Sequence, residues 1–124
     1  MSALLDTSVV IGPRPSDLAE GAAVSTVTIA ELRLGVLLAE DAATRSARLA
    51  RLVEVERLFR ALPVDDGVAS AYATIVATAR ESGRRPKTMD ALIAATAVAN
   101  DLVLYTRDRG LRDLAPARVV LITE

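Results

Sequence analysis

Short apolar runs alternate along the chain with longer segments in which apolar residues recur every three or four positions. The short runs predict strands at residues 3–6, 22–26, 62–64, 102–106 and 118–122. The longer segments predict helices at residues 28–39, 41–61 and 88–100, together with one that Asp65 or Asp66 caps and that continues to Arg80. This alternation predicts one α/β domain over residues 1–124. We expect a central, mainly parallel sheet of four to five short strands with helices on both faces.

Acidic residues stand at four places where an apolar run gives way to a helix start: Asp6, Glu31, Asp90 and Asp108. In open α/β sheets, ligand sites form beyond the carboxyl ends of the strands, so we expect these side chains to meet at one edge. Two carboxylates ~5 Å apart repel by roughly 3 kcal/mol at an effective dielectric near 20. A cluster of four therefore implies a divalent cation among them.

The composition narrows the chemistry of such a site. The chain has no histidine and no cysteine, which removes the usual general base and the usual zinc ligands. Carboxylates alone suit a hard cation such as Mg²⁺ or Mn²⁺. Aromatic residues make up only 2% of the chain, which argues against stacking of bases on aromatic platforms.

Length and hydropathy also bear on location. No apolar run approaches the length of a membrane span, and we expect no leader-like N-terminal segment. The lack of cysteine is compatible with the cytoplasm, where we expect the protein to reside.

Each acid also has an ordinary structural interpretation. Asp6 would cap a turn at residues 7–11, Thr28 and Glu31 have the spacing of a capping box, Asp90 would complement a helix dipole, and Asp108 would cap a turn at residues 109–114. Taken singly, capping is the stronger account of each residue. Four such positions at a common edge favour the metal site.

Two further patterns have open interpretations. A basic loop that includes Arg84, Arg85 and Lys87 precedes Asp90 and would either grip RNA phosphates or simply form a solvated surface. The helices at 28–39 and 41–61 carry broad apolar stripes, which include Phe59. These stripes are either core or a surface for a partner.

The four acids lie in short segments that form recognisable sequence motifs. Residues 5–8 read Leu-Asp-Thr-Ser, 28–32 Thr-Ile-Ala-Glu-Leu, 89–97 Met-Asp-Ala-Leu-Ile-Ala-Ala-Thr-Ala, and 106–109 Thr-Arg-Asp-Arg. These segments resemble PIN-domain ribonucleases, and most closely the VapC toxins of bacterial toxin–antitoxin pairs. The resemblance extends over nearly the whole chain, in order and with family-like spacing.

The resemblance implies a set of roles. Asp6, Glu31, Asp90 and Asp108 would hold Mg²⁺ or Mn²⁺, while the hydroxyls of Thr7, Ser8 and Thr106 would orient the ligands or water. It also implies an RNA substrate, a VapB-type antitoxin that covers the active-site groove, and a homodimer. Many relatives carry another acid followed by an aromatic residue after the Thr-Arg-Asp run, where this chain has Gly110-Leu111. Asp113 is a weak fifth candidate for the acidic site.

The reaction expected from these residues is metal-assisted hydrolysis of phosphodiester bonds by one or two ions. Without histidine, attack by water should leave a 5′-phosphate. One alternative is a catalytically silent binding module in which the acids only cap helices. Another is a receiver-like phosphoacceptor domain, but this would need adjacent acids after the first strand and a lysine near the last. Here Asp6 is followed by Thr7, and the single lysine is Lys87.

Overall fold

The computed structural model describes residues 3–13 and 21–123 and contains a five-stranded sheet in the order β3-β2-β1-β4-β5. The strands are β1 (Ala3–Leu5), β2 (Ala23–Ser25), β3 (Arg60–Leu62), β4 (Val103–Thr106) and β5 (Val119–Leu121). Every neighbouring pair of strands is parallel. The predicted parallel α/β sheet is therefore confirmed, and all carboxyl ends of the strands face the same edge.

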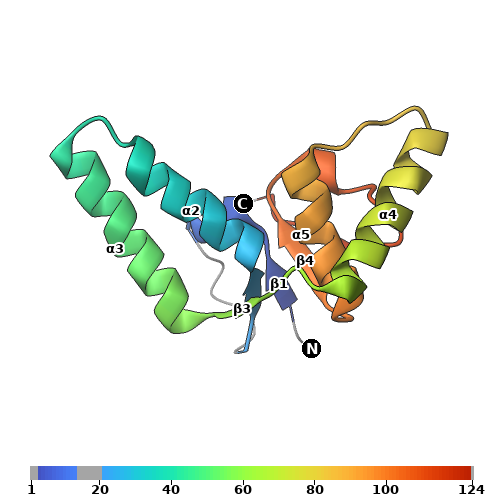
Figure 1. Ribbon diagram of the computed structural model, residues 1–124, viewed down its shortest axis with the longest axis horizontal. Helices are drawn as coiled ribbons and strands as arrows, with labels where there is room; N and C mark the ends of the chain where they lie inside the picture. Colours follow the sequence, from blue (N-terminus) through green and yellow to red (C-terminus); the bar gives the residue numbers. More distant parts are fainter. Residues whose placement is uncertain (1–2, 14–20, 124) are drawn as a thin grey trace.

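Helices cover both faces of this sheet, as predicted (Figure 1). One face carries α1 (Thr7–Val10), α2 (Thr26–Leu38) and α3 (Ala42–Leu58), and the other carries α4 (Asp66–Glu81) and α5 (Thr88–Ala99). Successive side chains of β1 point to opposite faces, so Leu5 joins the core under α2 and α3 while Leu4 joins the core under α4 and α5. A short 3-10 helix, η1 (Arg109–Leu111), packs through Leu111 against the core under α4 and α5.

The pairing of β1 with β4 positions the chain segments that carry the candidate acids. Leu5 lies opposite Tyr105 in the sheet, and the backbone N–H of Asp6 donates to the carbonyl oxygen of Tyr105 at 2.9 Å. Asp6, which follows β1, and Thr106, the last residue of β4, therefore emerge side by side.

The third strand differs from its prediction. The helix expected at residues 41–61 ends at Leu58, and β3 begins at Arg60 instead of residue 62. Arg60 and Ala61 are exposed at the edge of the sheet, and only Leu62 is buried. An edge strand with one buried side chain lacks the apolar run that marks the central strands, which is why the pattern misplaced it.

The start of α2 corrects a second expectation. The capping box of Thr28 and Glu31 is not formed, because α2 begins at Thr26 and Ser25 is its N-cap. The buried Ser25 Oγ accepts a hydrogen bond from the N–H of Val27 at 3.0 Å and is hydrogen-bonded to Thr96 Oγ1 of α5 at 3.2 Å. One hydroxyl thus joins the end of β2, the start of α2 and the middle of α5. The expected cap of α4 is confirmed as Asp65.

Within residues 3–13 and 21–123, no helix combines the length and the apolar character that crossing a bilayer requires.

Replacing Ser25 should destabilise the protein. We expect Ser25→Ala to lower the free energy of unfolding by about 1–2 kcal/mol, because the buried N–H of Val27 loses its partner. Chemical denaturation measures this loss, with Ser82→Ala at the exposed end of α4 as the control. Equal stability of the two variants would contradict the bridging role of Ser25.

Candidate active site

Asp6 is a buried carboxylate at the carboxyl end of β1, with 4% of its surface exposed. Its Oδ2 accepts hydrogen bonds from Ser8 Oγ at 2.8 Å and from Thr106 Oγ1 at 2.7 Å. Asp6 occupies the N-cap position of α1, as expected, but its side chain makes no capping hydrogen bond there. Two neutral hydroxyls stabilise the carboxylate without neutralising its charge.

The same two hydroxyls fix the loop that follows β4. Thr106 Oγ1 accepts from the N–H of Asp108 at 2.9 Å, and Ser8 Oγ accepts from the N–H of Arg107 at 3.0 Å. Each hydroxyl thus donates to Asp6 and accepts from the backbone of the β4 loop. Asp108 is consequently held near Asp6 although the two lie far apart in the sequence.

Glu31, in the second turn of α2, has a similar partner. Thr7 Oγ1 donates to Glu31 Oε1 at 2.7 Å and lies 2.9 Å from Thr28 Oγ1. Since the single hydroxyl proton of Thr7 goes to Glu31, the buried Thr28 must donate to Thr7. Sequence reasoning missed this role of Thr28. The signal was its position three residues before Glu31, which places both side chains on one face of a helix.

The three hydroxyls that the family resemblance singled out therefore contact two of the four acids, with Ser8 and Thr106 on Asp6 and Thr7 on Glu31. Their role in orienting metal ligands stays a prediction.

Asp90 belongs to the first turn of α5 and is partly buried. Burial raises its pKa, and the negative charges of Asp6, Asp108 and Glu31 raise it further, while Lys87 opposes them. Acids from three other segments therefore act electrostatically on Asp90 at this edge of the sheet.

These acids do not form a finished coordination cage. Among the residues that the structure describes, no three acidic side chains converge tightly enough to hold a metal ion as they stand. Asp6 and Glu31 are held by hydroxyls, and Asp108 Oδ1 accepts from the N–H of Gly110 at 2.8 Å. The expected capping role of Asp108 is thus confirmed. A Cβ at position 110 would lie 3.1 Å from that oxygen, so glycine leaves room for this cap.

The basic loop borders the same acids. A cavity of about 350 Å³ is lined by Arg84, Arg85, Pro86, Lys87, Asp90, Asp108 and Gly110. Arg84 donates to the backbone carbonyl oxygens of Gly110 and Asp113, which ties this loop to the segment after β4.

The exposed carboxylate of Asp113 lies 4.0 Å from Arg112 Nε, which offers no support for a fifth acid in the site.

Comparison with known proteins gives a consistent result. The family model of the PIN domain matches residues 3–116. Ribonuclease VapC8 of Mycobacterium tuberculosis is 47% identical over 100 residues, which cover 76% of this chain and 88% of the relative. Toxin FitB of Neisseria gonorrhoeae is 36% identical over 122 residues, covering 86% of this chain and 88% of the relative.

Solved structures agree in fold as well as in sequence. The crystal structure of VapBC-5 from Mycobacterium tuberculosis, a member of the VapBC family of toxin–antitoxin systems, matches with a TM-score of 0.87 and 38% identity over 99% of this chain and 98% of that chain. The chain therefore belongs to the PIN-domain family and, within it, to the VapC ribonucleases.

Proposed function

We propose that this single-domain chain is the endoribonuclease toxin of a VapBC-type pair, and that Asp6, Glu31, Asp90 and Asp108 hold Mg²⁺ or Mn²⁺. PIN-domain ribonucleases are metal-dependent as a class. The observation that carries the proposal is the raised pKa of Asp90, which burial raises and which the charges of Asp6, Asp108 and Glu31, from three other segments, raise further. A divalent cation would offset the repulsion that raises this pKa.

The donor set fits such a cation. The residues around the acids offer carboxylate and hydroxyl oxygens, which are the ligands that Mg²⁺ and Mn²⁺ prefer. Asp6 and Asp90 are the proposed direct ligands, while Glu31 and Asp108 ligate, bind through water or position the attacking water. When bound, the cation supplies Lewis-acid stabilisation of charge at the phosphate and lowers the pKa of water.

The chain's own residues hold these groups in place. Ser8 and Thr106 fix the orientation of the Asp6 carboxylate, and Thr7 fixes that of Glu31. The arrangement suits direct attack of water on the scissile phosphate, which leaves a 5′-phosphate. Arg84, Arg85 and Lys87 lie beside Asp90 and Asp108, where they are placed to bind flanking phosphates of RNA.

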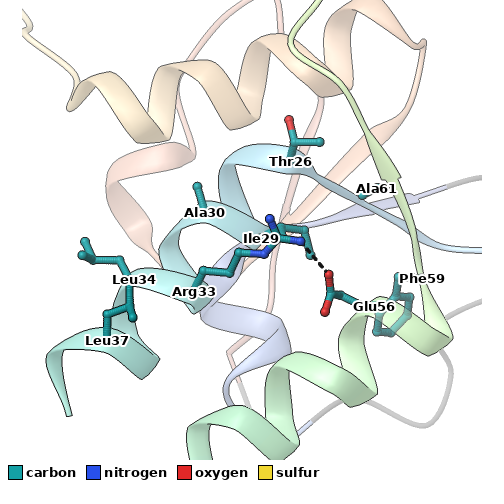
Figure 2. A pocket seen from close by; sticks show the side chains of 9 residues that line it. All are labelled: Thr26, Ile29, Ala30, Arg33, Leu34, Leu37, Glu56, Phe59 and Ala61. Atoms are coloured by element: carbon teal, nitrogen blue, oxygen red, sulfur yellow. Dashed lines mark hydrogen bonds and ion pairs between the residues drawn. The ribbon is translucent and has the colours of Figure 1, made fainter. Parts of the chain in front are cut away.

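An exposed apolar groove supports the proposal of an antitoxin partner. This groove lies between α2 and α3 and has a volume of about 580 Å³. Figure 2 shows the side chains that line it. Arg33 Nη2 and Glu56 Oε2 form an ion pair of 2.9 Å in the wall. Leu34 and Leu37 are 54% and 78% exposed, so the interpretation of the whole stripe as core is wrong. We propose that a VapB-type antitoxin covers these side chains, since VapBC-5 belongs to a toxin–antitoxin family.

The proposal also includes a homodimer and a cytoplasmic location. Exposed apolar side chains outside the groove, among them Leu49 and Val53 of α3, are compatible with a second copy. RNA is the proposed substrate, and cellular RNA is found in the cytoplasm.

Metal binding can be measured without catalysis. A carboxyl whose pKa is raised by folding favours the folded state below its ordinary value of 3.8, and this contribution is lost as the pH rises through the higher folded-state pKa. At pH 7 the metal-free Asp90→Asn variant should therefore melt at a higher temperature than the parent, with the difference shrinking at low pH. Mn²⁺ should stabilise the parent by about 2.7 kcal/mol at 100 times Kd and the variant far less.

The matched control is Asp113→Asn, which removes an exposed carboxylate paired with Arg112 and should keep the full response to Mn²⁺. An equal response of Asp90→Asn and the parent would favour the silent binding module.

Cleavage should depend on the hydroxyl of Thr106. Thr106→Val preserves the volume of this buried residue but removes the bond to Asp6 and should lower the cleavage rate roughly 10–100-fold. Thr106→Ser retains the hydroxyl and should stay near the parent.

Sequencing the ends of RNA after induced expression identifies the product. A 2′,3′-cyclic phosphate instead of a 5′-phosphate would contradict direct attack by water.

Antitoxin binding should depend on the groove between α2 and α3. Leu37→Arg places a charge in the apolar wall and should weaken the affinity for the cognate antitoxin tenfold or more, a loss of about 1.4 kcal/mol or greater. Titration calorimetry measures this affinity, and RNA cleavage by the free variant should be unchanged. Val64→Arg, at another exposed apolar side chain outside the groove, is the control. The same affinity for both variants would place the antitoxin elsewhere.

A further inference from the structure

A second cavity opens beside the acidic site, on the side of α3. It has a volume of about 390 Å³, and its wall includes Thr7 and Glu31 of the acidic site. Ile11 and Leu32 contribute apolar surface to it. The cavity is therefore continuous with the candidate active site and large enough for a small ligand group.

Two arginines of α3 complete the wall of this cavity, Arg48 and Arg51. Arg48 Nη1 donates to the carbonyl oxygen of Gly35 at 2.7 Å, and Arg51 Nη1 donates to that of Val10 at 3.2 Å. These acceptors are neutral, and neither guanidinium forms an ion pair with a carboxylate in the described part of the chain. Each guanidinium keeps its charge and further N–H donors while its position is fixed.

The same bonds have a structural explanation. Gly35 and Val10 lie in the last turns of α2 and α1, where arginine commonly satisfies free carbonyl groups. Arg45 does this too, donating to the carbonyl oxygen of Ala39 at 2.8 Å. Arg45, however, does not line the cavity. Capping explains these three of the α3 arginines, but it does not explain why Arg48 and Arg51 also face a cavity that contains Glu31.

The acids lie between two basic cavities. Arg84, Arg85 and Lys87 border Asp90 and Asp108 on one side, while Arg48 and Arg51 border Glu31 on the other. A strand of RNA that places its scissile phosphate at the acids carries further phosphates in both directions. The second cavity thus has the charge that the neighbouring phosphate requires.

We propose that Arg48 and Arg51 form a nucleotide subsite that binds an RNA phosphate next to the scissile one, with the adjoining nucleoside against Ile11 and Leu32. The proposal rests on the proposed ribonuclease function and extends it by a second point of contact for single-stranded RNA. The two arginines are positioning residues, because they grip the strand without touching the scissile phosphate.

The test compares the salt dependence of RNA binding, measured by fluorescence anisotropy of a single-stranded oligonucleotide in EDTA so that the strand is not cut. Each lost phosphate contact lowers the slope of log affinity against log salt by about 0.7 for single strands. The double variant Arg48→Gln/Arg51→Gln removes the contact to one phosphate and should therefore lower the slope by about 0.7. Arg48→Gln alone should give half this decrease, which decides the question if the double variant does not fold.

Two matched variants separate the subsite from capping and from net charge. The double variant Arg45→Gln/Arg57→Gln also removes two charges from α3, together with the bond from Arg45 to the carbonyl oxygen of Ala39 at the end of α2. It leaves the cavity intact and should keep the parent's slope. The double variant Arg48→Lys/Arg51→Lys keeps both charges and should also keep the parent's slope. With Mg²⁺ present, the Gln pair should raise KM several-fold with little change in kcat, since the contact is equal in ground and transition states.

An unchanged slope in the folded Gln variants, or an equal decrease in Arg45→Gln/Arg57→Gln, would overturn the subsite while the ribonuclease proposal stands. Absence of RNA binding and cleavage by the parent protein would overturn the proposed function itself, and the subsite with it.

Discussion

The buried carboxylate of Asp6 is the interaction on which the candidate site depends. An almost fully buried charge is tolerated only with good partners, and here Ser8 and Thr106 both donate to Oδ2. Because these hydroxyls also accept from the N–H groups of Arg107 and Asp108, the carboxylate fixes the loop after β4. The parallel pairing of β1 and β4 brings these partners together. The pairing of the central strands therefore also determines the geometry of the candidate site.

The surroundings of Asp6 combine negative charges at the edge of the sheet with positive side chains on both sides. Burial and, beside it, the like charges at the edge of the sheet raise the pKa of Asp90. Positive side chains lie on both flanks, from the loop before α5 and from α3. Several of these cations are held by backbone carbonyl groups instead of carboxylates, as Arg84, Arg48 and Arg51 are. Neutral acceptors position a cation without cancelling its charge, which suits a surface that must attract a polyanion while its acids remain available.

The sequence pattern was most informative where a segment is buried and regular. The central strands, the helices that cover them and the Asp65 cap of α4 followed from apolar spacing and capping chemistry. It failed at the edge and at junctions. β3 presents Arg60 and Ala61 to solvent, so burial leaves little mark on its sequence. The capping box of Thr28 and Glu31 was wrong because Ser25, buried against Thr96, supplies a competing cap that no local rule reveals.

The sequence by itself determined the parallel α/β architecture, the oxygen-only chemistry of the acidic residues and the family to which their segments point, since all three are written in local spacing and residue type. Only the tertiary structure decided that Ser8 and Thr106 hold Asp6, that Thr28 supports Thr7, and that Leu34 and Leu37 face solvent. It also decided that Arg48 and Arg51 line a cavity with Glu31. The physical reason is that hydrogen bonds and burial between distant segments depend on strand register and helix packing, which no short stretch of sequence encodes.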